Sequence, residues 1–188
     1  MSASPAGRPM RADAARNRAR VLEAAEAVFA ENGTSASTED VARRAGVGIA
    51  TVFRHFPTKG ALIEAVFAGL MRRFADEADA LCAAEDPAEA FFSFLTRIVD
   101  VSATKNAYTE ALTAAGVDVD DVLAEGRQEL PRALGALLDR AQRAGAVRAD
   151  IGVPELIVLM VGTSRAAERA TPEIQARILG IVFDGLRR

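Results

Sequence analysis

The chain of 188 residues has no tryptophan, and only 5% of its residues are aromatic. Its single cysteine, Cys82, cannot form an internal disulfide, which is typical of proteins from a reducing compartment. Its single histidine, His55, gives little support to a histidine-based catalytic triad or metal site. The longest apolar run, residues 156–162, is far shorter than the roughly 20 residues that a membrane-spanning helix needs. We therefore expect a cytoplasmic protein without membrane contact.

Half of the residues are apolar, and alanine and leucine are frequent. Because long stretches lack proline and runs of β-branched residues, this composition predicts an all-α protein of about nine helices. Residues 1–10 are mostly Ser, Ala, Pro and Gly, which predicts a disordered leader, and no apolar segment follows them as it would in a signal peptide.

Charge is distributed unevenly along the chain, whose net charge is −3. Residues 1–60 carry nine Lys or Arg and six Asp or Glu, whereas residues 61–188 carry 14 Lys or Arg and 20 Asp or Glu. Such asymmetry favours a basic module that faces nucleic acid, joined to an acidic module, although chance variation among solvated helix faces would also produce it. Five arginines lie within thirteen positions near the start and form a candidate basic arm for DNA: Arg8, Arg11, Arg16, Arg18 and Arg20.

The segment STEDVARRAGVGIATVFRHFPTK, residues 37–59, has the pattern of a helix-turn-helix. Ser37 is a good N-cap, with Asp40 at the third helical position in a variant of the capping box. Gly46 and Gly48 bracket a tight turn, and Pro57 ends the second helix. The second helix is therefore predicted to lie in the major groove of DNA.

The remainder predicts one helix after another, and no strand pattern is convincing. A first helix is expected over 14–31, and Thr58 is the expected N-cap of a long helix to about Ala83. Asp86 and Pro87 open the next helix, and a shorter one is expected near 108–115. A helix over 118–144 contains Pro131, so it either kinks there or consists of two helices. The last two helices are expected over about 154–169 and 172–186.

Residues 16–66 resemble the DNA-binding domain of the TetR family of transcriptional regulators. The resemblance is dense and ordered over some fifty residues, and its carrying positions are Ala24, Ala25, Phe29, Gly33, Thr38, Val41, Ala42, Ala45, Gly46, Val47, Thr51, Val52, Phe53, His55, Phe56, Lys59 and Leu62. It implies a helix-turn-helix domain over 11–59 and a helical effector-binding and dimerisation domain over 60–188. It also implies a homodimer that binds a palindromic operator and is released by a small apolar molecule.

The resemblance, together with the basic arm, gives a set of candidate DNA-binding residues: Arg16, Thr38, Gly48, Ile49, Ala50, Thr51, Phe53, Arg54, His55 and Lys59. In the family, the positions of Ile49, Ala50 and Arg54 set sequence preference, and the other helix-turn-helix positions touch phosphate or brace the helix. Arg54 can donate two hydrogen bonds to guanine, and Ile49 and Ala50 can contact a thymine methyl group. Two positions depart from the family pattern: Phe53 stands where tyrosine is usual, and Gly48 stands where serine is common.

The C-terminal part offers no catalytic constellation, no phosphate-binding glycine loop and no cluster of metal ligands, so we expect neither an enzyme nor a cofactor. Aromatic and aliphatic side chains at helical spacing are candidate ligand contacts or simply core: Phe67, Met71, Phe91, Phe94, Leu95, Tyr108 and Leu112. The last two expected helices are apolar on more than one side. Such a helix is either fully buried or shared with a partner, so these two helices are the expected dimer interface.

Two alternatives remain open from the sequence. The first is a DNA-binding protein without an effector, acting as an activator or an architectural factor. The second is a helical ligand-binding protein or enzyme in which the helix-turn-helix no longer binds DNA.

Overall fold

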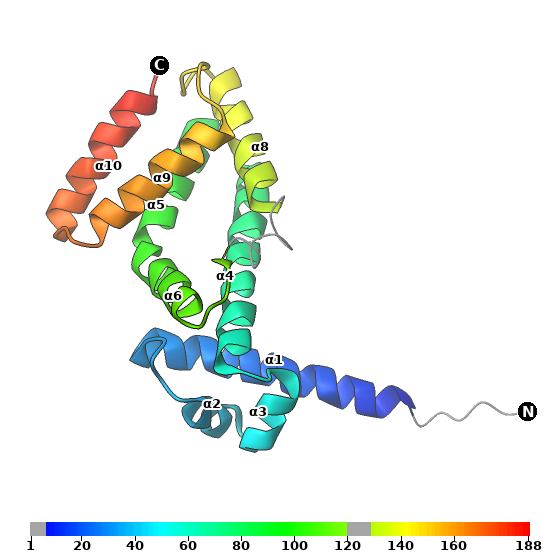
Figure 1. Cartoon of the computed structure of the whole chain (residues 1–188). Helices are drawn as coiled ribbons and strands as arrows, with labels where there is room; N and C mark the ends of the chain where they lie inside the picture. The colour runs from blue at the N-terminus through cyan, green and yellow to red at the C-terminus, as the bar shows by residue number, and fades with distance from the viewer. Residues whose placement is uncertain (1–6, 120–128) are drawn as a thin grey trace, which may run out of the picture. The chain divides into compact units, whose positions relative to one another are not determined.

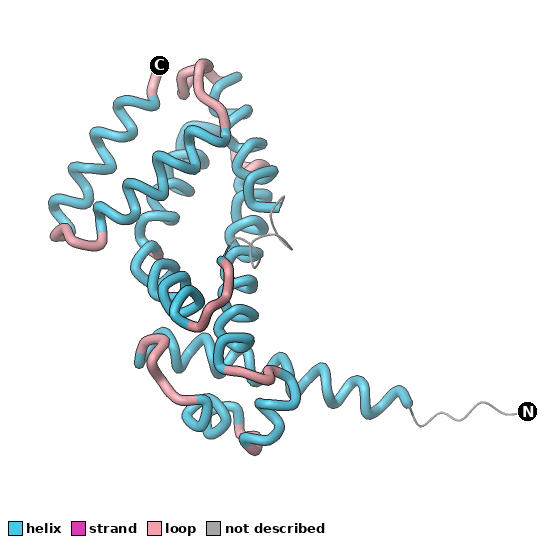
Figure 2. Tube along the Cα trace, viewed as in Figure 1, coloured by secondary structure: helices cyan, strands magenta, loops and turns pink. Residues whose placement is uncertain are grey.

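The structure is a computed structural model that describes residues 7–119 and 129–188. Nine helices fall in these ranges, and apart from them only an isolated bridge between Val147 and Arg187 is found there (Figures 1 and 2). The predicted all-α fold is confirmed. The helices are α1 (Gly7–Asn32), α2 (Thr38–Ala45), α3 (Ile49–His55), α4 (Lys59–Leu81), α5 (Pro87–Asp100), α6 (Ser102–Ala114), α8 (Glu129–Arg143), α9 (Val153–Ala167) and α10 (Pro172–Leu186).

The described residues divide into two units. The first contains residues up to Phe67 together with Ala107–Asp118, and the second contains Ala68–Asn106 together with the residues from Val119 onward. This division differs from the predicted boundary between residues 59 and 60. Helices α4 and α6 each begin in one unit and end in the other, so two continuous helices run through the division.

The core of the first unit forms where α1 packs against α2 and α3. Val21 and Phe29 of α1, Val41 of α2 and Val52 of α3 are all buried. The second half of α6 joins this unit through Tyr108, whose ring centroid lies 6.3 Å from that of Phe29. Burial of such side chains removes apolar area from water, and this is the main force that holds the three short helices together.

The core of the second unit is built around α5, which packs against α8 and α9. Phe91, Phe94 and Leu95 of α5 are fully buried, and Phe94 makes an edge-to-face contact with Phe74 of α4 at 6.3 Å. Asp86 caps α5 by accepting hydrogen bonds from the backbone N–H groups of residues 88 and 89, as the sequence predicts.

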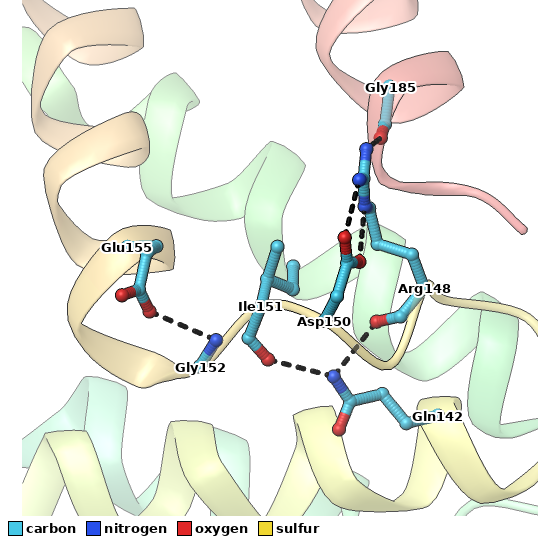
Figure 3. A network of polar contacts seen from close by, with 7 residues as sticks. All are labelled: Gln142, Arg148, Asp150, Ile151, Gly152, Glu155 and Gly185. Atoms are coloured by element: carbon cyan, nitrogen blue, oxygen red, sulfur yellow. Dashed lines mark hydrogen bonds and ion pairs between the residues drawn. The ribbon is translucent and has the colours of Figure 1, made fainter.

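A polar network fastens the loop between α8 and α9 to the end of α10 (Figure 3). The Arg148 guanidinium donates two hydrogen bonds of 2.6 Å to Asp150 and one of 3.3 Å to the carbonyl of Gly185. The hydrogen bond from Arg148 lowers the pKa of Asp150 to about 2. On the other side of the loop, the Gln142 amide donates to the carbonyls of Arg148 and Ile151 at 2.9 and 3.0 Å.

Several helix bounds differ from the prediction. α1 begins at Gly7, earlier than the expected start at Ala14, so the predicted leader overlaps its first turn, and residues 1–6 lie outside the described part. α6 begins at Ser102 and is longer than the segment expected near 108–115. Pro131 lies within α8 near its described start, and most of the preceding segment predicted as helix lies outside the described residues.

Candidate nucleic-acid interface

The turn between α2 and α3 is fixed by caps at both ends of α2. The Ser37 hydroxyl accepts from the Asp40 N–H at 3.1 Å, and the Asp40 carboxylate accepts from the Ser37 N–H at 3.3 Å, which confirms the predicted capping box. The hydrogen bonds from Ser37 lower the pKa of the Asp40 carboxyl. At the other end, Gly46 adopts a left-handed conformation with φ of +64° and donates its N–H back to the last turn of α2.

Helix α3 has one buried side and one exposed side. Val52 and Phe56, which closes the helix, are buried against the rest of the first unit. Ala50, Phe53 and Arg54 are exposed on the other side, and 43% of Phe53 is accessible, which is unusual for a large apolar residue. The helix therefore presents a short surface that combines apolar groups with a guanidinium.

Two arginines of α1 brace the turn and α3. The Arg20 guanidinium donates a hydrogen bond of 2.6 Å to the carbonyl of Ala45, the last residue of α2. The Arg18 guanidinium lies 5.1 Å from the centroid of the Phe56 ring, within the range of a cation–π contact. The sequence places both residues in a basic arm. The sequence does not indicate this bracing role, because Ala45 and Phe56 lie far from these two arginines along the chain.

The start of α4 is held in a similar way. Thr58 accepts from the N–H of Ala61 at 3.0 Å, as expected of an N-cap. The Lys59 ammonium donates to the carbonyl of Ser35 at 3.0 Å, so it braces α4 against the loop between α1 and α2. The rest of its hydrogen-bonding capacity remains for an anion, since an ammonium has three N–H donors.

The other candidate DNA-binding residues are placed as follows. Arg16 is exposed on α1 and forms an ion pair with Asp13. Thr38 is buried at the start of α2, with 8% of its surface accessible, so its side chain is the least available of the ten. The structure brings eight of the candidates together on α3 and the residues that flank it: Gly48, Ile49, Ala50, Thr51, Phe53, Arg54, His55 and Lys59. Their side chains are exposed or half-buried.

The seven candidate ligand contacts fall into two sets. Phe67, Tyr108 and Leu112 belong to the first unit, where the rings of Phe67 and Tyr108 lie 6.5 Å apart. The other four belong to the core of the second unit: Met71, Phe91, Phe94 and Leu95. All except Met71 are buried. Side chains of a hydrophobic core and side chains of a closed ligand site are both buried, so the role of these seven residues in ligand binding stays a prediction.

The described residues contain no group of three or more His, Cys, Asp or Glu placed to hold a metal ion. Within the same residues, no helix is both long and apolar enough to cross a bilayer.

Comparison with known proteins gives two matches to family models. Residues 21–66 match a model described as "Bacterial regulatory proteins, tetR family". Residues 86–188 match a model described as "Transcriptional regulator SbtR-like, C-terminal domain". The two models together take in both the helix-turn-helix and the helices from α5 to α10.

Solved structures give the same result. The chain is 43% identical to a TetR transcription regulatory protein from Mycobacterium vanbaalenii, with 96% of this chain and 100% of that chain covered and a TM-score of 0.75. It is 36% identical to a TetR transcriptional regulator from Streptomyces coelicolor, with 90% and 98% covered and a TM-score of 0.70. The structure of RolR in complex with the ligand resorcinol, at 19% identity, 94% and 90% coverage and a TM-score of 0.65, shares the fold.

Proposed function

Because the chain belongs to the TetR family of bacterial regulators, we propose that it is a homodimeric repressor that leaves a palindromic operator when a small molecule binds. The coarser function follows from the family itself: the protein is a DNA-binding transcriptional regulator and not an enzyme.

The observation that carries the proposal is the exposed side of α3. Val52 and Phe56 anchor the helix, while Ala50, Phe53 and Arg54 are left accessible with no competing role in the core. In a helix-turn-helix protein this side of the second helix enters the major groove. Arg54 is the group suited to guanine, because its guanidinium can donate to O6 and N7 together.

The remaining candidates divide between phosphate contacts, which position the protein, and apolar base contacts. Thr51, His55 and Lys59 approach phosphates, which raises affinity with little effect on sequence preference. Ile49 and Ala50 contact thymine methyl groups. The buried side chain of Thr38 leaves its backbone N–H, at the start of α2, as the donor to a phosphate.

The dimer is proposed from the accessible apolar side chains of α9 and α10, which are joined by a short turn (Figure 1). Val158 and Ile181 are each more than 70% exposed, and four further residues of these helices are also exposed: Ile157, Leu159, Val161 and Ile174. Clustered apolar exposure of this kind marks an interaction surface. A Cβ atom at Gly162 would meet nothing within 4 Å, so a partner helix can approach the backbone there.

The proposed switch uses the two helices that run through the division of the chain. α4 begins beside the helix-turn-helix at Lys59 and ends in the second unit, and α6 begins in the second unit and ends in the first. A ligand that binds one arrangement of these helices more tightly than another shifts the population between them, and by no more than that difference in affinity. RolR shows that a protein of this fold can hold a small aromatic ligand.

The residue roles are tested by substitution, with DNA binding measured by fluorescence anisotropy on the selected site and on single-base variants. Arg54→Ala should remove discrimination of about 1–3 kcal/mol at one base pair in each half-site. Lys59→Ala should weaken binding to all variants alike and flatten the dependence of affinity on salt. Arg143→Ala, which removes an exposed charge in the last turn of α8, is the control and should change neither. If Arg54→Ala and Lys59→Ala behave alike, the proposed division of roles is wrong.

A further inference from the structure

The turn between α9 and α10 is tied by the side chain of Gln175, which lies near the start of α10. Its amide nitrogen is 2.7 Å from the carbonyl oxygen of Ala167, the last residue of α9, and 3.4 Å from that of Ala170 in the turn. Both partners are carbonyl oxygens, so the amide donates in each case. The Ala167 carbonyl also accepts from the Ala170 N–H at 3.0 Å. One half-buried side chain therefore joins the start of α10 to the end of α9.

Helix α10 depends on such ties because it buries few of its own side chains. Only Leu179 and Leu186 of this helix are buried. Among the helices of the described residues, α10 packs mainly against α9, to which the turn connects it (Figure 1). A helix is normally held in place by a continuous apolar side that faces a core. Two buried leucines leave much of the orientation of α10 to its polar contacts.

The C-terminal end of α10 is anchored independently of Gln175. The Arg148 N–H donates to the carbonyl of Leu186 at 2.9 Å, next to the side-chain contacts of Arg148 in Figure 3. The ring centroid of Phe183 lies 4.9 Å from that of Phe92 in α5. A helix axis has a defined direction only when both of its ends are held. Gln175 supplies the second fixed point, because the chain connection through the turn limits the distance between α9 and α10 but not the angle between them.

The angle between the two helices matters because the exposed apolar surface is shared between them. Val158 of α9 and Ile181 of α10 are its two most exposed members. The core of a protein interface is packed about as closely as a protein interior, so a partner fits both helices only at one angle. In a two-fold dimer each copy presents the same surface, and a displaced α10 therefore disturbs the interface twice.

We propose that Gln175 is a positioning residue for dimerisation. Its two hydrogen bonds hold the start of α10 against the end of α9, at the angle that a second copy of the chain recognises. Gln175 acts through this angle, because its amide is already engaged with the carbonyls of its own chain. The inference rests on the proposed function, in which the dimer forms through α9 and α10, and it names a residue on which that interface depends.

The test measures self-association of the full-length protein without DNA, by energy transfer between donor-labelled and acceptor-labelled copies over a dilution series. Gln175→Met keeps the length of the side chain but removes the donor, and it should raise the Kd of the dimer at least about tenfold, since each copy loses its tie. Gln175→Glu turns a carboxylate toward carbonyl oxygens at the C-terminal end of α9 and should raise the Kd further. A wild-type Kd in both variants would overturn the proposal.

Arg140→Met is the matched control for a general loss of stability. The half-buried Arg140 side chain of α8 also donates to two carbonyls after the end of a helix, those of Leu81 at 3.3 Å and Ala84 at 2.8 Å, but it ties α8 to the end of α4. Arg140→Met should lower the melting temperature and leave the Kd of the dimer unchanged. If it raises the Kd as much as Gln175→Met does, the effect is one of stability, and Gln175 has no positioning role.

Two further measurements separate this inference from the proposed function. Amide hydrogen exchange in α10 should be faster in Gln175→Met than in wild type, even in samples dilute enough to be monomeric, and unchanged exchange would overturn the inference. If Val158→Glu dissociates the dimer but Gln175→Met leaves its Kd unchanged, the proposed dimer stands and the inference fails. If wild type is a monomer, or if Val158→Glu leaves the dimer intact, the proposed interface fails and the inference fails with it.

Discussion

Gly46 offers a quantitative test of how the helix-turn-helix is built, through the substitution Gly46→Ala. Its φ of +64° is a left-handed conformation, which costs an L-amino acid about 1–2 kcal/mol. A Cβ atom there would also lie 3.0 Å from the guanidinium of Arg20, which donates to the carbonyl of Ala45. Displacing that hydrogen bond should add about 1 kcal/mol. We therefore expect a total loss of about 2–3 kcal/mol in the free energy of unfolding.

Two other glycines provide matched controls. Gly145 has a similar φ of +72° and open space around it, so Gly145→Ala should show only the backbone cost of about 1–2 kcal/mol and leave DNA binding unchanged. Gly48 has an ordinary φ of −70° and equally open space, so Gly48→Ala should stay within about 1 kcal/mol of wild type.

The assay is urea unfolding followed by far-ultraviolet circular dichroism, with DNA affinity measured in parallel. Gly46→Ala should also weaken DNA binding, because the turn sets the direction of α3. In the Arg20→Ala background the substitution should cost about 1 kcal/mol less, since the hydrogen bond is already lost. If Gly46→Ala costs no more than Gly48→Ala, the reasoning from backbone conformation is refuted.

Three further predictions concern the DNA surface, the dimer and the loop of Figure 3. Phe53→Tyr adds a hydroxyl to an exposed ring and should tighten DNA binding by about 1 kcal/mol, roughly fivefold, in anisotropy titrations; unchanged affinity would mean that the ring does not reach a phosphate. Val158→Glu or Ile181→Glu places a charge in the proposed interface and should convert dimers to monomers in size-exclusion chromatography with light scattering, whereas an unchanged mass would place the interface elsewhere. The Asp150 carboxyl has its pKa lowered from 3.8 to about 2, chiefly by the hydrogen bond from Arg148, so it stabilises the fold above pH 3.8 and loses this contribution as the pH falls toward 2. Asp150→Asn should therefore unfold at a lower temperature than wild type at neutral pH, and a difference that persists at pH 2 would contradict the assignment.

The helix-turn-helix could be predicted from the sequence because its determinants are local. Ser37 and Asp40 stand three residues apart in the capping box, and Gly46 supplies the left-handed turn that few other residues adopt. Thr58 and Asp86 likewise cap the helices that follow them directly. The type and order of these helices therefore follow from short patterns.

Other features depend on partners far along the chain. Gly7 and Pro9, which have low helix propensity, lie within α1, so the sequence predicts a later start for this helix than the structure has. The start of α6 is rich in small polar residues with weak helix propensity, and Asn106 is buried there because Glu168, 62 residues later, accepts its hydrogen bond. No local pattern around Asn106 or around Glu168 predicts that these two side chains form a hydrogen bond.

The same limit applies to the residues around α3. Arg20 looks like part of a basic arm in the sequence, whereas the structure directs it to the carbonyl of Ala45, 25 residues away. Phe67 and Phe94 are both candidate ligand contacts because each belongs to a run of apolar residues at helical spacing. In the structure they belong to different units. Periodicity identifies a buried side of a helix, and only the packing shows which side chains meet there.

The most direct test of the central claim is a selection of binding sites from random double-stranded DNA with the full-length protein at low salt. We predict an enriched palindrome whose two half-sites each contain a guanine that the Arg54→Ala variant no longer selects. Failure to enrich any sequence, or enrichment of the same palindrome by Arg54→Ala with unchanged preference at every position, would contradict the claim that the exposed side of α3 recognises DNA.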